Sequence, residues 1–268
     1  MFDSHKRGSP LLTLNERQER IRALLAGNGR LNASQLAAQL QVSTMTLRRD
    51  LSALQQAGVL TRTHGGCVLQ SPFVAEASFP DKLRRQQAQK TAIASAAARR
   101  LRRGDAVYVD TGTTALAVAR ALPTDRDLKV FTNNLRVALE LFGRAGVEVT
   151  VYGGVLARKN PDLVDAMALA QISQYRLDVA IVGGDALDVE RGEFYAADAG
   201  SAALSRTAQR QADRVIVVMD SSKFGRRGLA LAGRLARGMM LITDAAVDAK
   251  VCAALRRRGA TLLCQEIP

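Results

Sequence analysis

The residues best suited to chemistry lie close together in the stretch STMTLRRDLSALQQA, residues 43–57. Leu47, Leu51 and Leu54 recur at intervals of four and three, which places them on one face of a helix. The opposite face carries short hydroxyls and guanidinium groups, which are the groups that reach base edges and phosphates in DNA. These residues are Thr44, Thr46, Arg48 and Arg49. Ser43 can cap the first turn with its hydroxyl. The stretch predicts a DNA-recognition helix, and the alternative is an ordinary amphipathic helix with a solvated basic face.

A glycine-rich turn, RTHGG, follows this helix between two short strand-like runs. Gly65 and Gly66 allow positive φ at its tip and let the backbone approach a phosphate closely. Arg62 and His64 would supply the side-chain contacts to DNA. The turn predicts the wing of a winged helix. For His64 a turn histidine without a ligand stays open as the alternative.

A second group of polar residues follows the apolar runs of the C-terminal part. Glycine and threonine at a strand-to-helix junction offer free N–H groups, hydroxyls and the positive end of a helix, all suited to a phosphate. The members of this group are Asp110, Gly112, Thr113, Thr114, Thr132, Asn133, Asn134, Gly153, Gly154 and Lys223. Lys223 would neutralise phosphate charge, and a surface ion pair with Asp220 is its alternative role. The P-loop pattern is absent and GxGxxG does not occur here, which disfavours dinucleotide binding.

The elements that position the DNA-contacting residues are short helices. Residues 15–26 and 34–39 have helical apolar spacing, and a tight turn at residues 41–42 leads into the recognition helix. Residues 59–61 and 67–69 are the two predicted strands. Two helices joined by a turn of a few residues and followed by a hairpin are typical of a winged helix-turn-helix.

The C-terminal part alternates apolar runs with helical stretches, which predicts a largely parallel sheet covered on both faces. The expected strands are residues 106–109, 130–131, 147–152, 179–182, 215–219 and 239–242. The expected helices are residues 114–121, 134–144, 166–175, 202–211 and 247–258. Ligands of such sheets bind at the carboxyl ends of the strands, where the polar group lies. The fold class is therefore two-domain, with an N-terminal winged helix-turn-helix and a C-terminal α/β domain.

Charge separates the two parts. The chain of 268 residues has a net charge of +13, of which +5 falls in residues 1–70 and +7 in residues 81–103. Residues 70–80 contain two prolines and no periodicity, so they form a connector, and residues 81–103 are expected to form one long alanine-rich basic helix. This excess of cations favours a polyanionic partner for the first hundred residues.

The three cysteines, Cys67, Cys252 and Cys264, show neither a CxxC pair nor a metal-binding spacing. This disfavours structural disulfides and zinc, and it favours a reducing cytoplasm. No apolar run approaches the ~20 residues needed to span a bilayer, so no membrane partner is expected. Residues 1–14 lack a signal-peptide core and are interpreted as a flexible tail. No cofactor and no catalytic residue are predicted.

The order TLRRDL, Gly58-x-Leu60 and then His64-Gly65-Gly66 resembles the DeoR family of bacterial transcriptional regulators. The resemblance covers residue 15 to the end. It implies a DNA-binding domain at residues 15–70, a linker and basic helix at 71–103, and an effector domain at 104–268. That domain is expected to be similar to ribose-5-phosphate isomerase and glucosamine-6-phosphate deaminase, with its site used for sensing. Phosphorylated sugars are the implied ligands.

By residue, the family's DxGTT, TNN, glycine-pair and DSSK motifs match the polar group named above. Asp50 is expected to order Arg48 or Arg49, or to cap local backbone. There are also departures, since Asp165 stands where the family usually has glycine, and Ser201 and Ser205 replace two charged residues. A carboxylate at position 165 would repel a bound phosphate. A different sugar phosphate, an unphosphorylated polyol and an empty pocket all stay open.

These observations favour a repressor of a carbohydrate-metabolism operon that a phosphorylated sugar releases from double-stranded operator DNA. A homodimer or homotetramer is expected, because symmetric proteins read repeated half-sites. Only the resemblance favours repression over activation. A DNA-binding regulator with a vestigial pocket is one alternative. A sugar-phosphate isomerase or deaminase is another, although it would have Asp110 and Asp185 but no histidine in the C-terminal domain.

Overall fold

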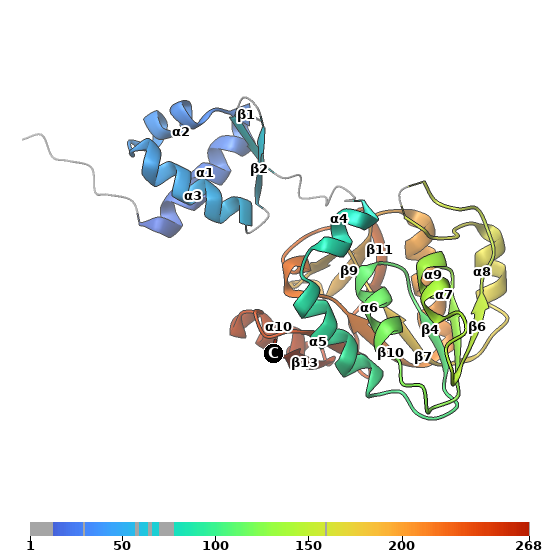
Figure 1. The fold of residues 1–268 in the computed structure, drawn as a ribbon. Coiled ribbons are helices and arrows are strands. Elements are labelled where there is room, and N and C mark those ends of the chain that lie inside the picture. The colour runs from blue at the N-terminus through green and yellow to red at the C-terminus, as the bar shows by residue number, and fades with distance from the viewer. Residues whose placement is uncertain are drawn as a thin grey trace, which may run out of the picture. The chain divides into compact units, whose positions relative to one another are not determined.

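The computed structural model describes residues 13–28, 30–56, 59–63, 66–69, 78–158 and 160–267. The chain divides into two compact units, residues 1–71 and 72–268 (Figure 1). Of the predicted tail only residues 13 and 14 are described, and Leu14 already begins the first helix. Among the described residues, no helix combines the length and the apolar content that crossing a membrane requires.

The first unit has three helices and a small antiparallel sheet, which confirms the winged helix-turn-helix. The helices are α1 (Leu14–Asn28), α2 (Ala33–Leu40) and α3 (Thr44–Gln56), and the strands are β1 (Arg30–Leu31), β2 (Leu60–Thr63) and β3 (Gly66–Leu69). Leucine and isoleucine side chains from all three helices meet in one buried cluster that contains Ile21, Leu36 and Leu47. The helical spacing therefore placed the core correctly.

Short local signals fix the ends of α2. Asn32 accepts a hydrogen bond from the backbone N of Gln35 at 2.8 Å, and the Gln35 side chain accepts one from the backbone N of Asn32 at 2.9 Å, which is a capping box. Gln41 then takes a left-handed conformation with φ of 54° and turns the chain toward α3. The strand β1, which pairs with β3, was not predicted, because two residues carry no alternation to detect.

The second unit is built on a seven-stranded sheet whose order is β13-β12-β10-β7-β4-β5-β6, with every neighbouring pair parallel. Its strands are β4 (Ala106–Val109), β5 (Leu128–Thr132), β6 (Val147–Val151), β7 (Leu177–Val182), β10 (Ala212–Val218), β12 (Met240–Asp244) and β13 (Thr261–Gln265). The predicted parallel sheet is confirmed, and the edge strand β13 was missed.

Helices cover both faces of the sheet (Figure 1). One face packs on α5 (Gln87–Ala98), α6 (Thr113–Ala121) and α7 (Leu135–Leu141), and the other on α8 (Ala166–Ile172), α9 (Ala199–Gln211) and α10 (Ala249–Arg257). Strand β4 shows the alternation directly, since Val107 and Val109 join the first core while Tyr108 joins the second.

The strand order creates a crevice. From β4 the chain adds β5 and β6 on one side, and then it returns to place β7 on the other side of β4. Open α/β sheets bind ligands where the order reverses in this way, at the carboxyl ends of the two central strands. The loops after β4 and β7 are therefore the first place to look for a ligand.

One prediction about the second unit is wrong, and one sheet was missed. Residues 81–103 do not form one helix, because the chain forms α4 (Phe79–Arg84), breaks at Gln86 with a left-handed φ of 53°, and resumes as α5. Phe79, the first residue of α4, is buried in the core. A separate antiparallel sheet of β8 (Ala186–Asp188), β9 (Glu193–Ala196) and β11 (Ala230–Arg234) was also missed, because these strands are short and β11 is far from the other two in sequence.

A candidate DNA-binding surface and a candidate effector pocket

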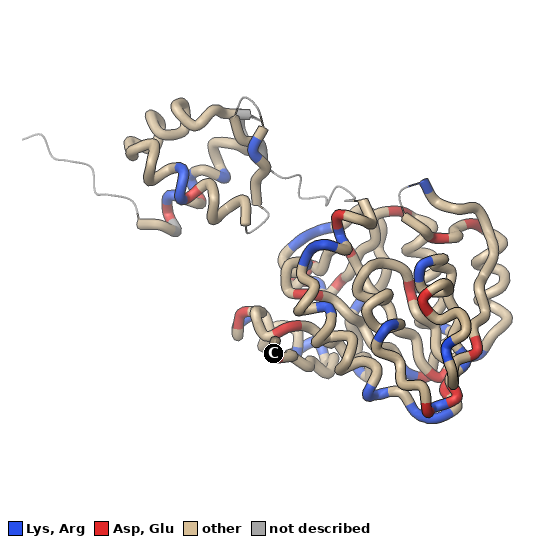
Figure 2. The backbone as a smooth tube through the Cα atoms, viewed as in Figure 1, with Lys and Arg blue, Asp and Glu red and all other residues tan. Residues whose placement is uncertain are grey.

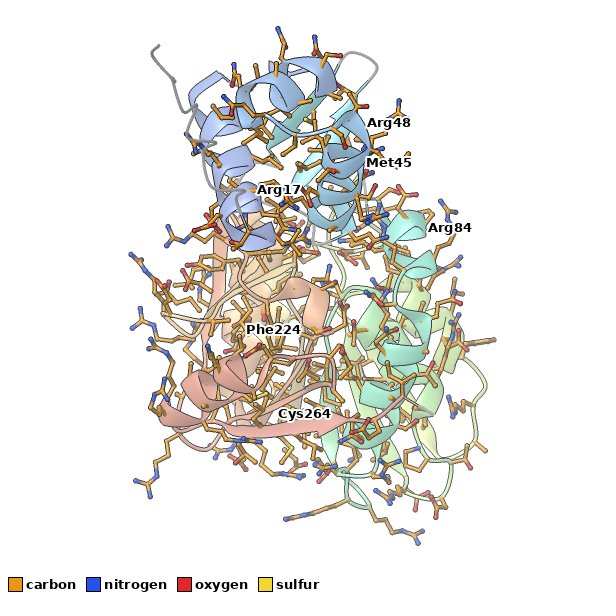
Figure 3. All side chains as sticks on the ribbon, turned by 90° about the vertical axis from the view of Figure 1, so that its left-hand side faces the viewer. Arg17, Met45, Arg48, Arg84, Phe224 and Cys264 are labelled. Carbon is orange, nitrogen blue, oxygen red and sulfur yellow. The ribbon has the colours of Figure 1, made fainter. Side chains whose placement is uncertain are left out.

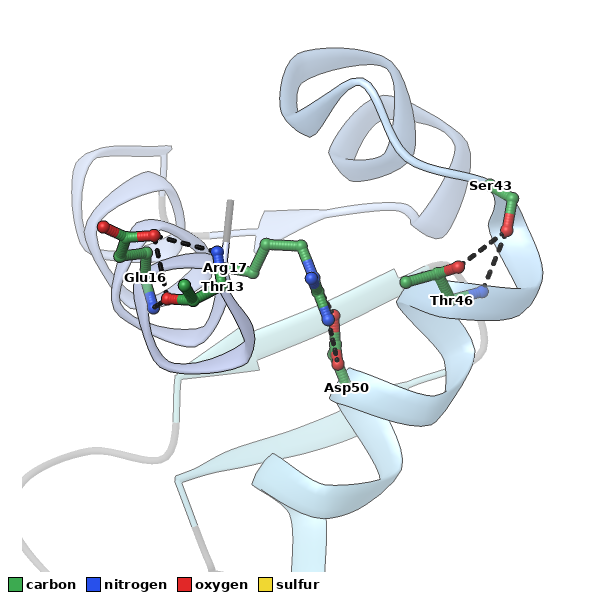
Figure 4. A network of polar contacts seen from close by, with 6 residues as sticks. All are labelled: Thr13, Glu16, Arg17, Ser43, Thr46 and Asp50. Atoms are coloured by element: carbon green, nitrogen blue, oxygen red, sulfur yellow. Dashed lines mark hydrogen bonds and ion pairs between the residues drawn. The ribbon is translucent and has the colours of Figure 1, made fainter. Parts of the chain in front are cut away.

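Helix α3 presents the predicted surface. Its buried side carries Leu47, Leu51 and Leu54, while Thr44, Arg48 and Arg49 are exposed. The Ser43 hydroxyl accepts a hydrogen bond from the backbone N of Thr46 at 3.1 Å, and the two hydroxyl oxygens lie 2.9 Å apart (Figure 4). Ser43 therefore caps the helix as predicted, and Thr46, half-buried, shares that cap.

Met45 belongs to the same surface and was missed by the sequence reasoning. Its side chain is 74% exposed on α3, on the side that also carries Arg48 (Figure 3). Methionine is apolar like the leucines of this helix, so its residue type suggests a core position. Only its place on the helix shows that its side chain is exposed. An exposed apolar side chain here can contact the methyl group of thymine.

Asp50 does not order Arg48 or Arg49, so that prediction is wrong. Its carboxylate is almost fully buried and accepts two hydrogen bonds from Arg17 of α1, from Nε at 2.7 Å and from Nη2 at 3.2 Å (Figure 4). A bidentate arginine compensates the charge and the hydrogen-bonding capacity of a buried carboxylate. The pair ties α1 to α3, across a separation of 33 residues that the sequence pattern does not reveal.

The wing residues have mixed positions. Arg62 of β2 donates hydrogen bonds to the backbone O of Arg48 at 3.0 Å and to the Ser52 hydroxyl at 2.9 Å, which fixes the wing strand on α3. Gly66 has a φ of 147°, and a Cβ added there would lie 2.4 Å from the backbone O of Leu31, so close strand packing requires this glycine. His64 and Gly65 lie outside the described residues.

The second unit contains a pocket at the reversal between β4 and β7. It opens to solvent, and the space within and at the mouth of it, open solvent included, amounts to about 670 Å³. Its walls come from the loops after these two strands, the start of α9, the short 3-10 turn η1 (Ser221–Lys223) and α4. The polar lining residues include Lys82, Asp110, Thr113, Thr114, Asp162, Asp185, Asp198, Ser201, Ser205 and Lys223. Five of the ten predicted effector residues lie here, namely Asp110, Gly112, Thr113, Thr114 and Lys223.

The start of α6 forms one end of this pocket. Gly112 is its N-cap with a φ of 93°, and no side chain caps the first turn by a hydrogen bond. The first N–H groups of the helix and the hydroxyls of Thr113 and Thr114 are therefore placed at the pocket wall. Helix N-termini of this kind bind phosphate groups.

Two buried carboxylates form another part of the wall. Asp110 accepts hydrogen bonds from the backbone N of Gly183 at 3.1 Å and from the Tyr108 hydroxyl at 3.2 Å, and burial raises its pKa to about 6. Asp162 accepts one from the Asn134 side chain at 2.5 Å, and burial raises its pKa to about 7. Asp162 was missed, because it lies far along the loop between β6 and α8 and not directly after a strand.

The remaining predicted effector residues lie outside the pocket lining. Thr132, Asn133 and Asn134 are fully buried and hold its back wall. Asn133 accepts a hydrogen bond from the Tyr108 hydroxyl at 2.8 Å, and Asn134 caps α7 while it holds Asp162. These amides support the carboxylates rather than reach the open space.

The glycine pair after β6 also lies away from the open space. The backbone N of Gly153 donates to the Gln171 side chain at 3.0 Å. Gly154 has a φ of 148°, and a Cβ there would lie 2.8 Å from Asp165 Oδ1. The positive φ and the close approach to Asp165 therefore require glycine at position 154, whereas a Cβ at Gly153 would meet only ordinary contacts.

Three lysines stand at or near the pocket. Lys223 lines the pocket. Among the described residues no ion pair joins Lys223 to Asp220. The Asp220 carboxylate instead accepts hydrogen bonds from the backbone N and the hydroxyl of Ser222. Lys82 of α4 lies 3.3 Å from Asp185. Lys90 of α5 is buried, donates to the backbone O of Lys82 at 2.5 Å and of Arg85 at 2.6 Å, and has a pKa lowered to about 8 by burial.

Comparison with known proteins decides the family. The profile of the DeoR-like helix-turn-helix domain matches residues 17–73, and that of the DeoR C-terminal sensor domain matches residues 85–245. The chain belongs to the DeoR family. It is a DNA-binding transcriptional regulator with a sensor domain.

DeoR-family relatives match along most of their length. The transcriptional repressor AccR of Agrobacterium fabrum is 34% identical over 85% of this chain and 89% of its own. The repressor CsqR of Escherichia coli is 33% identical over 87% and 88% of the two chains, and the glycerol-3-phosphate regulon repressor of the same organism is 31% identical over 86% and 90%. These relatives are named as repressors, which indicates a regulator rather than an enzyme.

Solved structures give weaker matches to this DeoR-family chain. Ribose 5-phosphate isomerase A from Methanocaldococcus jannaschii superposes with a TM-score of 0.37 and 15% identity, over 50% of this chain and 53% of the other. The full-length sorbitol operon regulator SorC from Klebsiella pneumoniae gives a TM-score of 0.32 and 16% identity, over 77% and 89%. Similarities at this level carry no conclusion about fold or function.

The structure locates the three departures from the DeoR-family pattern. Asp165 caps α8 by accepting hydrogen bonds from the backbone N of Met167 at 2.8 Å and of Ala168 at 3.0 Å, and it is not part of the pocket lining. Ser201 and Ser205 do line the pocket, and the Ser201 hydroxyl donates to Asp198 at 2.7 Å. The two serines are thus the departures that change the wall of the pocket.

Proposed function

We propose that this regulator represses a carbohydrate-metabolism operon and that a phosphorylated sugar, bound in the sensor pocket, lowers its affinity for operator DNA. The observation that supports this most is the composition of the pocket at the strand reversal. The N-terminus of α6, which no side chain caps, and Lys223 line the same pocket as the buried carboxylates Asp110 and Asp162. A sugar phosphate needs both kinds of group at once.

The hydrogen-bond donors of the pocket would bind the phosphate. Backbone N–H groups at the start of α6, the hydroxyls of Thr113 and Thr114, and the Lys223 ammonium are all donors, and the helix end adds positive potential. The carboxylates would take the sugar hydroxyls, since Asp110 and Asp162 can accept hydrogen bonds from O–H donors. The relative named for glycerol-3-phosphate supports a phosphorylated polyhydroxy compound as the ligand class.

The DNA part would place α3 in the major groove. Thr44, Thr46, Arg48 and Arg49 would face bases and phosphates, with Ser43 holding the first turn. The wing would follow the backbone through Arg62, His64, Gly65 and Gly66. A homodimer or homotetramer is proposed, because a winged helix reads one half-site and operators repeat half-sites. The site of action would be the cytoplasm, where operator DNA is found.

A thermal-shift screen tests the ligand. The full chain would be heated with ribose 5-phosphate, glycerol 3-phosphate and other sugar phosphates, each beside its unphosphorylated counterpart. A ligand at one hundred times its Kd stabilises a protein by about 2.7 kcal/mol, which raises Tm measurably. The proposal expects a rise with a phosphorylated member only.

Variants locate the binding. Lys223→Met should weaken the active phosphate about tenfold or more, the amount a charged hydrogen bond contributes. Lys250→Met, an exposed lysine on α10, is the matched control and should bind as the wild type does. A response to free sugars alone, no response to any compound, or turnover of a sugar phosphate would each contradict the proposal.

A further inference from the structure

Helix α4 brings one cation into the sensor pocket from outside the sheet. Lys82 and Asp185 both line the pocket, and Lys82 Nζ lies 3.3 Å from Asp185 Oδ1. Their side chains are 13% and 21% exposed, so this ion pair sits at the boundary between pocket and protein. From the sequence, Lys82 was expected either to lie on a solvated basic face or to contact a DNA phosphate.

The geometry of the pair suits exchange of partners. Charged N–H···O hydrogen bonds usually measure about 2.7–2.9 Å, so a separation of 3.3 Å leaves the pair short of its best contact. Asp185 is fixed, because its backbone N donates to the backbone O of Tyr195 at 2.8 Å at the edge of the small sheet. Lys82 lies on a helix of only six residues, so of the two partners Lys82 is the one that can move toward a new anion.

Helix α4 is also the first described element after the DNA-binding unit. Ser78, its N-cap, is the first described residue after the segment 70–77 that leads from the DNA-binding unit. Phe79 anchors the helix in the core, Lys90 binds the backbone O of Lys82, and α4 packs against α6, whose N-terminus lines the pocket. Whatever displaces Lys82 therefore acts on the first element of the sensor.

We propose that Lys82 is an effector-binding residue and that the anionic group of the effector replaces Asp185 as its partner. The inference rests on the proposed function for the identity of the anion. The Lys82–Asp185 pair stabilises the operator-binding state, and its loss to the ligand shifts α4 and lowers operator affinity. Such coupling requires that the ligand bind the two states differently, and the exchanged ion pair supplies that difference.

The pocket is lined by four carboxylates and two lysines, and further cations lie near its α4 side. Figure 2 shows Lys and Arg positions gathered near α4 in the second unit. The pKa of Lys90 is lowered to about 8, mainly by burial, and the neighbouring charges of Lys223, Lys82 and Arg85 contribute to this shift while Asp220 opposes it. An anionic group that reaches Lys82 also approaches Lys223 across the same pocket.

The first test needs no ligand. Lys82→Met, Asp185→Asn and the double variant would be compared with the wild type by fluorescence anisotropy on a labelled operator, using the full chain. Each single variant should weaken operator binding about fivefold or more, and the double variant should be no weaker than either, since both remove one interaction. Arg84→Met is the control, because Arg84 lies on the same helix but is 71% exposed and outside the pocket lining.

The second test uses the ligand-dependent response. Ribose 5-phosphate, glycerol 3-phosphate and the same compounds without phosphate would be added to each variant, with Tm and operator affinity measured together. A phosphate that shifts the wild type should bind Lys82→Met at least tenfold more weakly and should no longer change its operator affinity. Arg84→Met should respond as the wild type does. Far-UV circular dichroism would confirm that every variant is folded.

The two proposals fail in different ways. If no sugar phosphate shifts the wild type, the proposed function fails, while the ligand-free comparison still judges the ion pair. If the wild type responds and Lys82→Met responds equally, Lys82 is not an effector-binding residue and only the proposed function stands. Wild-type operator affinity in both single variants, or effects that multiply in the double variant, would overturn the coupling.

Discussion

The two units of the molecule bury carboxylates in opposite ways. In the DNA-binding unit Asp50 is 2% exposed and is held by the guanidinium of Arg17, whose own pKa is raised by this hydrogen-bonded partner. In the sensor the described hydrogen-bond donors to Asp110 and Asp162 are neutral amides and a hydroxyl, and burial raises both pKa values. One arrangement joins two helices, and the other lines a pocket.

Under the proposed function, the difference separates a structural acid from a ligand-facing one. A carboxylate that a bidentate arginine satisfies has little capacity left for a ligand, and its removal mainly affects folding. A carboxylate with neutral donors and a raised pKa is costly to keep charged, and such groups gather at functional sites. Asp110 and Asp162 also contact open space at the strand reversal, which makes them the acceptors available to sugar hydroxyls.

The largest effect is expected at the structural acid. Arg17→Met leaves the Asp50 carboxylate buried without its cation, which should destabilise the DNA-binding unit by about 3–5 kcal/mol. Hydrogen exchange of peptides from α1 and α3 in the full chain would measure the loss. Arg22→Met removes an exposed pair with Glu19 on the same helix and should cost under about 1 kcal/mol. Equal losses in the two variants would contradict the comparison.

Asp162 should instead make the free energy of unfolding of the sensor depend on pH. With a pKa near 7, folded Asp162 keeps its proton where the unfolded carboxyl has lost it, so its contribution to the free energy of unfolding falls as pH rises from about 4 to 7. Each raised pKa unit corresponds to about 1.4 kcal/mol, which sets the effect at a few kcal/mol. Asp162→Asn should remove this part of the pH slope.

The sensor can be followed alone in this experiment. All four tyrosines lie in the second unit and the chain has no tryptophan, so tyrosine fluorescence during urea unfolding reports on the sensor. Asp125→Asn, an exposed carboxylate, is the control and should leave the slope as it is. An unchanged slope in Asp162→Asn would mean that Asp162 titrates like a solvated acid.

The exposed face of α3 should affect binding without affecting folding, in contrast to Arg17. Arg48→Ala or Arg49→Ala should weaken operator binding by about 1–3 kcal/mol if that arginine contacts a base. The dissociation constant would be measured at fixed salt, beside hydrogen exchange to show that α3 is intact. Wild-type affinity in both variants would mean that another face of the unit meets DNA.

Met45 should give the smallest effect. If its exposed side chain contacts a thymine methyl, replacing that thymine by uracil should cost the wild type about 0.8 kcal/mol, the amount for one buried methyl-sized group. Met45→Ala should already have lost this contact and should bind both operators alike. Equal losses in the wild type and the variant would place the methyl group against another residue.

The first unit could be predicted almost completely because its signals are local. The leucine spacing of α3, the Ser43 cap and the glycine after the helix all lie within a few residues of the element that they define. Besides the two-residue strand β1 and the exposed Met45, the Arg17–Asp50 pair was missed, since it depends on how α1 and α3 pack and no local pattern reports that contact.

The sensor site could be predicted only in part because tertiary packing assembles it. The loop 110–114 and Lys223 were found, because they follow buried strands and carry groups suited to phosphate. Lys82 and Asp162 were missed, since a basic helix and an irregular loop give no sign of the pocket that they reach. Residues 132–134 were placed correctly at a strand end, yet the side chains of this threonine and two asparagines are buried and support the wall.

The most direct test of the account measures operator affinity with and without the sugar phosphate that raises Tm. The full chain would be titrated onto a labelled operator, obtained by selection from random DNA, and Lys223→Met would be titrated beside it. The account predicts at least about fivefold weaker binding when the phosphate occupies the wild-type pocket, and no change in Lys223→Met at the same concentration. Unchanged or tighter operator binding by the occupied wild type would contradict it.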